Sequence, residues 1–139
     1  MRQGFVKVAA VTPNVRVADV EYNTQEICKK IDETVANGAK IVVFPELCVT
    51  GYTCGDLFAQ SALLKASADA LKVIVEHTEG KDAIIFVGLP YVVRNKVYNV
   101  AAAISRGELL GLTTKTFLPN YAEGYEMRQF QPGPKKADW

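Results

Sequence analysis

A strand–helix–strand pattern in the first 44 residues constrains the fold most. Residues 5–11, FVKVAAV, are short, apolar and closed by a Thr-Pro pair, which is typical of a buried strand. Residues 40–44, KIVVF, form a second short apolar segment that we expect to be buried. Between them, Asp19 is a suitable N-cap and Asn37-Gly38 a suitable stop for a helix over 19–36. Its apolar positions recur at helical steps: Val20, Thr24, Ile27, Ile31 and Val35. This order predicts two neighbouring parallel strands.

A second helix and three further strands are predicted after the loop at 45–56. Asp56 is expected to cap a helical region that runs to the turn at Gly80. Its apolar face is expected to contain Leu64, Ala68, Leu71 and Val75. The segments 83–93, 97–104 and 109–115 are separated only by RNK and SRG, which indicates an antiparallel meander. The predicted class is therefore α/β, a mixed sheet with helices on one face, followed by an irregular segment from Lys115 onward.

Composition excludes several kinds of partner. Sixteen basic and fifteen acidic residues in 139 give a net charge of +1, without the basic stripe that nucleic acids or anionic membranes attract. No apolar run approaches the ~20 residues needed to span a bilayer, and Lys7 interrupts the apolar N-terminus, unlike a signal peptide. Three cysteines without paired spacing favour a reducing compartment, so we expect a cytoplasmic protein.

Two charged residues are placed where α/β folds build sites. Glu46 follows the second strand and Pro45, at the carboxyl end where ligands bind in such folds. A partly desolvated carboxylate there can serve as a general base, although a strand-end glutamate that points into solvent is an equal alternative. Lys115 ends the last strand of the meander and can stabilise an oxyanion, although a lone lysine there is more often solvated.

The cysteines offer weaker candidates. Cys28 lies beside Ile27 on the first helix and is expected to pack as a small apolar side chain. Cys48 and Cys54 follow Glu46, so a glutamate-assisted thiolate is conceivable, less so for Cys48 because it shares a short segment with Glu46. A metal site of Cys48, Cys54 and His77 matches no ligand spacing that we know, so no metal is expected.

Five aromatic residues lie in the loops that follow Glu46 and Lys115: Tyr52, Phe117, Tyr121, Tyr125 and Phe130. Such a cluster more often covers the edge of a core than lines a ligand pocket. Here the tyrosine hydroxyls lie close in sequence to both charged candidates, which favours a pocket for a small polar substrate.

Two motifs carry a resemblance to a known family. FPEL followed by GY, together with KTFLPNYAEGYE, resembles the nitrilase superfamily of carbon–nitrogen hydrolases. Within it, FPELCVTGYTCGDLF and KTFLPNYAEGYEMRQF are most similar to the glutaminase domains of glutamine-dependent NAD synthetases. The resemblance implies part of an α-β-β-α sandwich and a catalytic triad of glutamate, lysine and cysteine.

Site roles follow from this resemblance residue by residue. Glu46 matches the general base, and Lys115 matches the lysine that stabilises the tetrahedral intermediate. Tyr52 and Tyr121 match aromatic positions that line the glutamine pocket.

Three further positions in the second motif are less clear. Glu123 and Glu126 fall where the family places acidic residues near the substrate, and the resemblance does not choose between them. Gly124 departs from the large aromatic residue that is usual there, which puts one wall of the pocket in doubt.

The family's nucleophilic cysteine follows a later strand, typically in a Cys-Glu-Asp segment, and no cysteine follows Cys54 in this sequence. We therefore expect residues 1–139 to be the N-terminal portion of a glutaminase domain, inactive alone. Glutamine, a C-terminal synthetase domain that binds ATP and Mg²⁺, and further copies of the chain are the expected partners. A fragment of another amidase or carbamoylase, or a non-catalytic assembly module, are the alternatives.

Overall fold

The computed structural model describes residues 4–119 and 126–136. Its elements are β1 (Val8–Ala10), α1 (Val20–Ala36), β2 (Ile41–Val43), the 3-10 helix η1 (Gly55–Ala59), α2 (Ser61–His77), β3 (Ile84–Val93), β4 (Lys96–Ser105), β5 (Glu108–Thr114) and α3 (Glu126–Gln129). Within these residues, no helix is long and apolar enough to cross a membrane.

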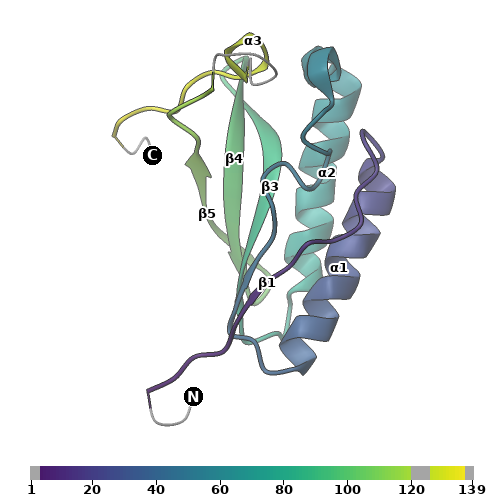
Figure 1. Cartoon of the computed structure of the whole chain (residues 1–139), viewed down its shortest axis with the longest axis vertical. Helices are drawn as coiled ribbons and strands as arrows, with labels where there is room; N and C mark the ends of the chain where they lie inside the picture. The colour runs from purple at the N-terminus through teal and green to yellow at the C-terminus, as the bar shows by residue number, and fades with distance from the viewer. Residues whose placement is uncertain (1–3, 120–125, 137–139) are drawn as a thin grey trace.

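The five strands form one mixed sheet in the order β1-β2-β3-β4-β5. β1, β2 and β3 are parallel, whereas β4 is antiparallel to both β3 and β5. Helices α1 and α2 lie side by side on one face of this sheet (Figure 1). The predicted α/β class, the parallel start and the antiparallel meander are therefore confirmed.

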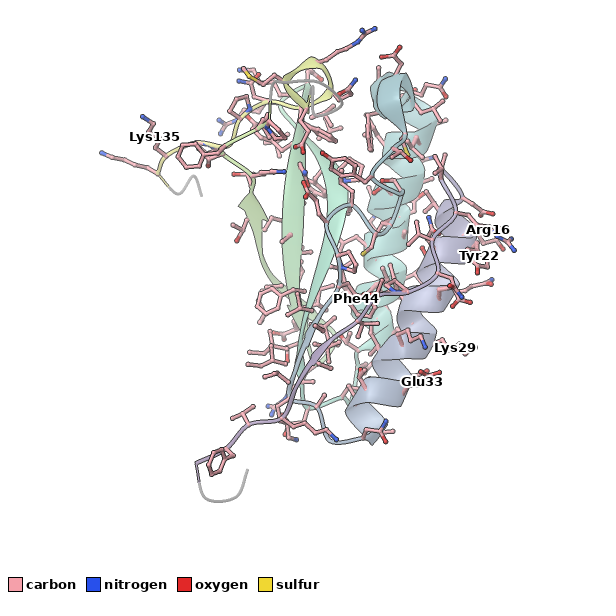
Figure 2. The ribbon with its side chains drawn as sticks, in the orientation of Figure 1. Arg16, Tyr22, Lys29, Glu33, Phe44 and Lys135 are labelled. Atoms are coloured by element: carbon pink, nitrogen blue, oxygen red, sulfur yellow. The ribbon has the colours of Figure 1, made fainter. Side chains whose placement is uncertain are left out.

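Helix α1 forms where the sequence predicts it. The side chain of Asp19 accepts a hydrogen bond from the backbone N–H of Tyr22, and the cap at Asn37 is followed by Gly38 with φ +90°. The apolar stripe turns inward, with Ile27 and Ile31 fully buried. Tyr22, Lys29 and Glu33 project from the opposite side of the helix (Figure 2).

The core lies between the helices and the sheet. Alternate residues of β3 and β4 point toward the helices, because successive side chains of a strand face opposite sides. These residues are almost fully buried: Ile85, Val87, Leu89, Val100, Ala102 and Ile104. Ile27 and Ile31 of α1 and Ile74 of α2 complete the layer.

The other face of the sheet is apolar and exposed within the described residues. Val8 of β1, Val43 of β2 and Ile84 of β3 are 63%, 45% and 39% exposed. The expectation that segments 5–11 and 40–44 are buried is therefore wrong for Phe5, Val8 and Val43. Strand alternation turns Val8 and Val43 away from the helices.

The second helix differs from the prediction at its start and in its buried face. Asp56 lies inside η1, and α2 begins only at Ser61, after Gln60. The buried stripe consists of Leu63, Ser67, Ala70, Leu71 and Ile74. Leu64, Ala68 and Val75 are only half-buried at its edge. This buried face was not predicted because Ser67 is polar. Its hydroxyl is buried and donates a hydrogen bond to the carbonyl of Pro90.

The segment expected to be irregular contains one short helix. Glu126–Gln129 form α3, which begins with a backbone hydrogen bond from Glu126 to Pro119. Four residues are too few to produce a periodic pattern, so the prediction of an unstructured loop missed this turn.

Gly88 in β3 permits the segment that follows β2 to pass directly against β3. A Cβ atom at this position would lie 2.5 Å from the backbone nitrogen of Leu47 and 2.7 Å from the carbonyl oxygen of Pro45. Leu47 itself has φ +52°, an uncommon conformation for a non-glycine residue. The backbone on both sides of Glu46 is thus held directly against β3.

Replacing Gly88 with alanine is expected to destabilise the fold. The added methyl group collides with backbone atoms that have no rotamer to change, so we expect a loss of about 1–3 kcal/mol. Gly111→Ala in β5 is the control, because a Cβ there meets nothing within 4 Å and should change stability by about 0.5 kcal/mol or less. Urea unfolding followed by circular dichroism measures both, and equal midpoints would contradict the close-approach argument.

Candidate active site

Strand direction brings Glu46 and Lys115 to one edge of the sheet. Glu46 follows β2 and Lys115 follows β5, and both strands run in the same direction as β3. Asn99 is near the beginning of β4, which runs in the opposite direction and therefore starts at this edge. Residues from three strand ends meet here although 69 positions separate Glu46 from Lys115.

The ammonium of Lys115 contacts two carboxylates. Its Nζ lies 2.7 Å from Oε1 of Glu46 and 2.9 Å from Oε1 of Glu126. The side chain of Glu126 is only 6% exposed, whereas those of Lys115 and Glu46 are 30% and 41% exposed. Glu46 and Lys115 are thus in direct contact, and the solvated alternative for Lys115 is not observed.

The protonation of Lys115 reflects this environment. Partial burial disfavours its charge, but hydrogen bonds to Glu46 and Glu126 and the charges of both carboxylates outweigh burial. The pKa of Lys115 is therefore raised above its ordinary value, and the side chain carries a positive charge at neutral pH.

Tyr52 extends the network from the loop after Glu46. Its hydroxyl donates a hydrogen bond to Oε1 of Glu126 at 2.7 Å. This bond, with burial and the nearby negative charges, raises the pKa of Tyr52 to about 12. Within the described residues, Oε2 of Glu126 is buried without a hydrogen-bond partner. Glu126, expected near the substrate, thus contacts the charged pair directly.

Asn99 belongs to this network, and the sequence analysis missed it. Its Nδ2 lies 2.5 Å from Oε1 of Glu46, and the residue is only 3% exposed. An asparagine within the apolar strand segment VYNVAAAI was a signal of a buried polar contact. The identity of its partner, however, depends on how the strands pair.

Two cavities adjoin the network. One, of about 300 Å³, is lined by Glu46, Asn99 and Lys115 together with apolar residues of β2, β3 and β4. The other, of about 410 Å³, lies between Tyr52, Phe58, Glu126 and Arg128. Both are within the usual size range of sites for small ligands.

The cysteines lie apart from Glu46. The thiol of Cys48 is buried and donates to the carbonyl of Gly88, and burial raises its pKa to about 11. The thiol of Cys54 is also buried and donates to the carbonyl of Thr50; burial raises its pKa as well. Cys28 is half-buried at the edge of the core, as predicted. The geometry therefore disfavours a thiolate activated by Glu46 at Cys48 or Cys54.

The possible metal site is not formed. His77 contacts Asp32 of α1 at 2.8 Å, whereas Cys48 and Cys54 contact backbone carbonyls. Among the residues that the structure describes, no group of three His, Cys, Asp or Glu side chains could hold a metal ion.

The aromatic residues do not form one pocket. Phe117 is 87% exposed, and Phe130 packs in the core with its ring centroid 4.8 Å from that of Phe58. Of the described members, only Tyr52 contacts the charged network. Tyr121, Glu123, Gly124 and Tyr125 lie outside the described residues, so their predicted roles stay predictions.

Comparisons with known proteins show which sequences this chain resembles. The chain is 44% identical over 120 residues to a glutamine-dependent NAD(+) synthetase of Aquifex aeolicus, covering 86% of this chain and 21% of the relative. It is 38% identical over 132 residues to the enzyme of that name from Mycobacterium tuberculosis, covering 95% of this chain and 19% of the relative. The chain thus spans about a fifth of the length of these relatives.

A solved structure is also similar. The crystal structure of a glutamine-dependent NAD(+) synthetase from Cytophaga hutchinsonii superimposes with a TM-score of 0.89 and 28% identity, covering 95% of this chain and 22% of that one. The family model described as carbon-nitrogen hydrolase matches residues 7–137, nearly the whole chain. The chain therefore belongs to the carbon-nitrogen hydrolase family.

Proposed function

We propose that residues 1–139 form the N-terminal part of a glutaminase domain that supplies ammonia for NAD synthesis. The observation that carries this proposal is the placement of the Lys115 ammonium between Glu46 and Glu126 at the edge of a cavity. A general base and a cation that stabilises an oxyanion are two of the groups that enzymes use to hydrolyse an amide. The similarity to glutamine-dependent synthetases supports glutamine as the amide.

Each charged group has one task in the proposed reaction. Glu46 accepts the proton of a cysteine thiol, whose sulfur attacks the side-chain carbonyl carbon of glutamine. Lys115 stabilises the negative charge that develops on the carbonyl oxygen. Glu46 then protonates the departing nitrogen as the carbon–nitrogen bond breaks, which releases ammonia. Water hydrolyses the resulting thioester to glutamate.

The nucleophile in this proposal comes from outside the 139 residues. Cys48 and Cys54 are buried with raised pKa values and contact backbone carbonyls. Neither is suited to attack a substrate in the cavity beside Glu46. The chain by itself would bind the amide without cleaving it.

Further partners of the chain follow from the same proposal. Ammonia would pass to a synthetase domain that binds ATP and Mg²⁺ and amidates an adenylylated nicotinic acid dinucleotide. Those cofactor sites would lie outside this chain. The exposed apolar face of the sheet supports contact with further polypeptide, either of the same domain or of another copy.

A hybrid synthetase tests the catalytic roles. In it, residues of this chain replace the aligned residues of the Aquifex aeolicus enzyme, and ammonia release from glutamine is measured. Because Glu46 moves the proton, Glu46→Gln should lower kcat by about 10²- to 10⁴-fold.

Glu76→Gln, an exposed glutamate of α2, is the control and should leave the rate unchanged. Full activity of the Glu46→Gln hybrid would refute the proposed role. Hydrolysis of simple aliphatic amides in preference to glutamine would favour the amidase alternative, and the absence of any amide hydrolysis would favour an assembly module.

Alkylation tests whether any of the three cysteines is reactive. A raised pKa keeps a thiol protonated at pH 8, and only the thiolate reacts. Burial raises the pKa of all three thiols. Because Cys48 and Cys54 are also shielded from the reagent, iodoacetamide or a glutamine-like electrophile should label them in the native 139-residue chain far more slowly than the half-buried Cys28. Peptide mass spectrometry locates the adducts, and urea should expose all three. Rapid labelling of Cys48 or Cys54 by the glutamine analogue would relocate the nucleophile.

Removing the cation should destabilise the fold in a pH-dependent manner. Lys115→Met leaves the buried Glu126 carboxylate without its counter-ion, which we expect to cost about 1–3 kcal/mol at pH 7. Because the folded pKa of Lys115 is raised, its contribution persists up to the unfolded pKa of about 10.4 and is lost as pH rises further.

Lys40→Met is the matched control, since Lys40 pairs with the exposed Asp82 and such pairs contribute about 1 kcal/mol or less. Urea unfolding from about pH 7 to about pH 11 measures both variants. A loss in Lys115→Met that stays the same as the pH rises above about 10.4 would show that the buried carboxylate does not depend on the charge of Lys115.

A further inference from the structure

Glu46 receives its hydrogen bonds on one oxygen. Nδ2 of Asn99 and Nζ of Lys115 both donate to Oε1, at 2.5 and 2.7 Å. Within the described part of the chain, every hydrogen bond of this carboxylate is made by Oε1. Its two oxygens are therefore chemically different, and Oε2 keeps its lone pairs for another group.

Asn99 bridges both members of the charged pair. Its side chain donates to Glu46, and its backbone carbonyl accepts a hydrogen bond from the backbone N–H of Lys115 at 2.8 Å. Because Asn99 is buried in β4, its amide is held by the sheet. A rigid strand residue thus fixes the relative position of the base and the cation.

We infer that Asn99 is a positioning residue that makes Oε2 of Glu46 the oxygen that accepts and returns the proton. The inference rests on the proposed function, because it assigns an orientation to the same general base. Two donors on Oε1 restrain rotation of the carboxylate and occupy one oxygen. Asn99 itself forms and breaks no covalent bond, and the proton moves only between the nucleophile, Oε2 and the leaving nitrogen.

An amide suits this task better than a charged group. It donates a hydrogen bond without adding a second cation, which would hold the proton-accepting carboxylate too strongly in its charged form. An aspartate would add negative charge against Glu46. Among the residues that the structure describes, the charged and titratable groups in this network around Glu46 are Lys115 and, beyond it, Glu126 and Tyr52. Substitution of Asn99 removes none of these groups.

A purely structural role for Asn99 makes a different prediction. A buried amide requires a hydrogen-bond partner whatever the function. If that were all, replacing Asn99 would lower stability and leave the kinetics of the folded enzyme unchanged. Two measurements distinguish these roles: NMR spectroscopy of the chain, and whether a substitution of Asn99 changes kcat or KM.

Nuclear magnetic resonance tests the contact in the 139-residue chain. Glu46→Gln should shift the side-chain amide proton resonances of Asn99, because it replaces the charged acceptor of their hydrogen bond with a neutral one. Asn37, which caps the C-terminal end of α1, provides a reference amide. An Asn99 side-chain resonance that does not respond to Glu46→Gln would overturn the inference.

Kinetics of the hybrid synthetase test the function. Asn99→Leu removes the donor and Asn99→Asp replaces it with a carboxylate; each should lower kcat by about 10- to 100-fold while changing KM by less than about threefold. Ser67→Ala, which removes a buried hydroxyl on the helix side of the sheet, is the matched control. Backbone amide spectra of the chain show whether each variant folds.

The outcomes distinguish the two proposals. A hybrid that loses activity with Glu46→Gln but keeps its kcat with both folded Asn99 variants overturns this inference and leaves the proposed function intact. A hybrid that is inactive before substitution, or indifferent to Glu46→Gln, overturns the proposed function and the inference with it. Loss of kcat in both folded Asn99 variants, with unchanged KM, supports the inference.

Discussion

The contact of the Lys115 ammonium with two carboxylates is the interaction on which the site depends. Glu126 is buried, and a carboxylate removed from water needs compensating charge or hydrogen bonds. Lys115 and the Tyr52 hydroxyl provide these on Oε1. The same ammonium also contacts Glu46. The Lys115 ammonium therefore links the buried Glu126 carboxylate to the half-exposed Glu46 carboxylate, which lines the cavity.

Backbone geometry explains why these groups can meet. Glu46 lies between Pro45 and Leu47, whose backbone is pressed against Gly88, where no Cβ could be accommodated. Leu47 takes the left-handed conformation and is fully buried. An uncommon backbone conformation persists only where the surroundings hold it, and such positions gather at functional sites. The sheet thus restrains Glu46 through its main chain as well as through Asn99.

The failed prediction of α2 and the omission of Asn99 share a physical cause. The register of α2 was misjudged because the buried Ser67 looks polar in the sequence, and its start because Asp56 belongs to η1. Asn99 was passed over because its partner, Glu46, is 53 positions away. In each case a polar residue is satisfied by a distant group, and local pattern does not reveal that group.

The sequence by itself determined the strand–helix–strand start, the meander, the helix cap at Asp19 and the two charged residues that follow strands, because periodicity and capping are local properties of the chain. Only the tertiary structure decided which groups meet. The parallel direction of β2, β3 and β5 brings Glu46 to Lys115, and the reversed direction of β4 places Asn99 between them. Strand pairing connects residues that are remote in sequence, so contacts of this kind exist only once the sheet has formed.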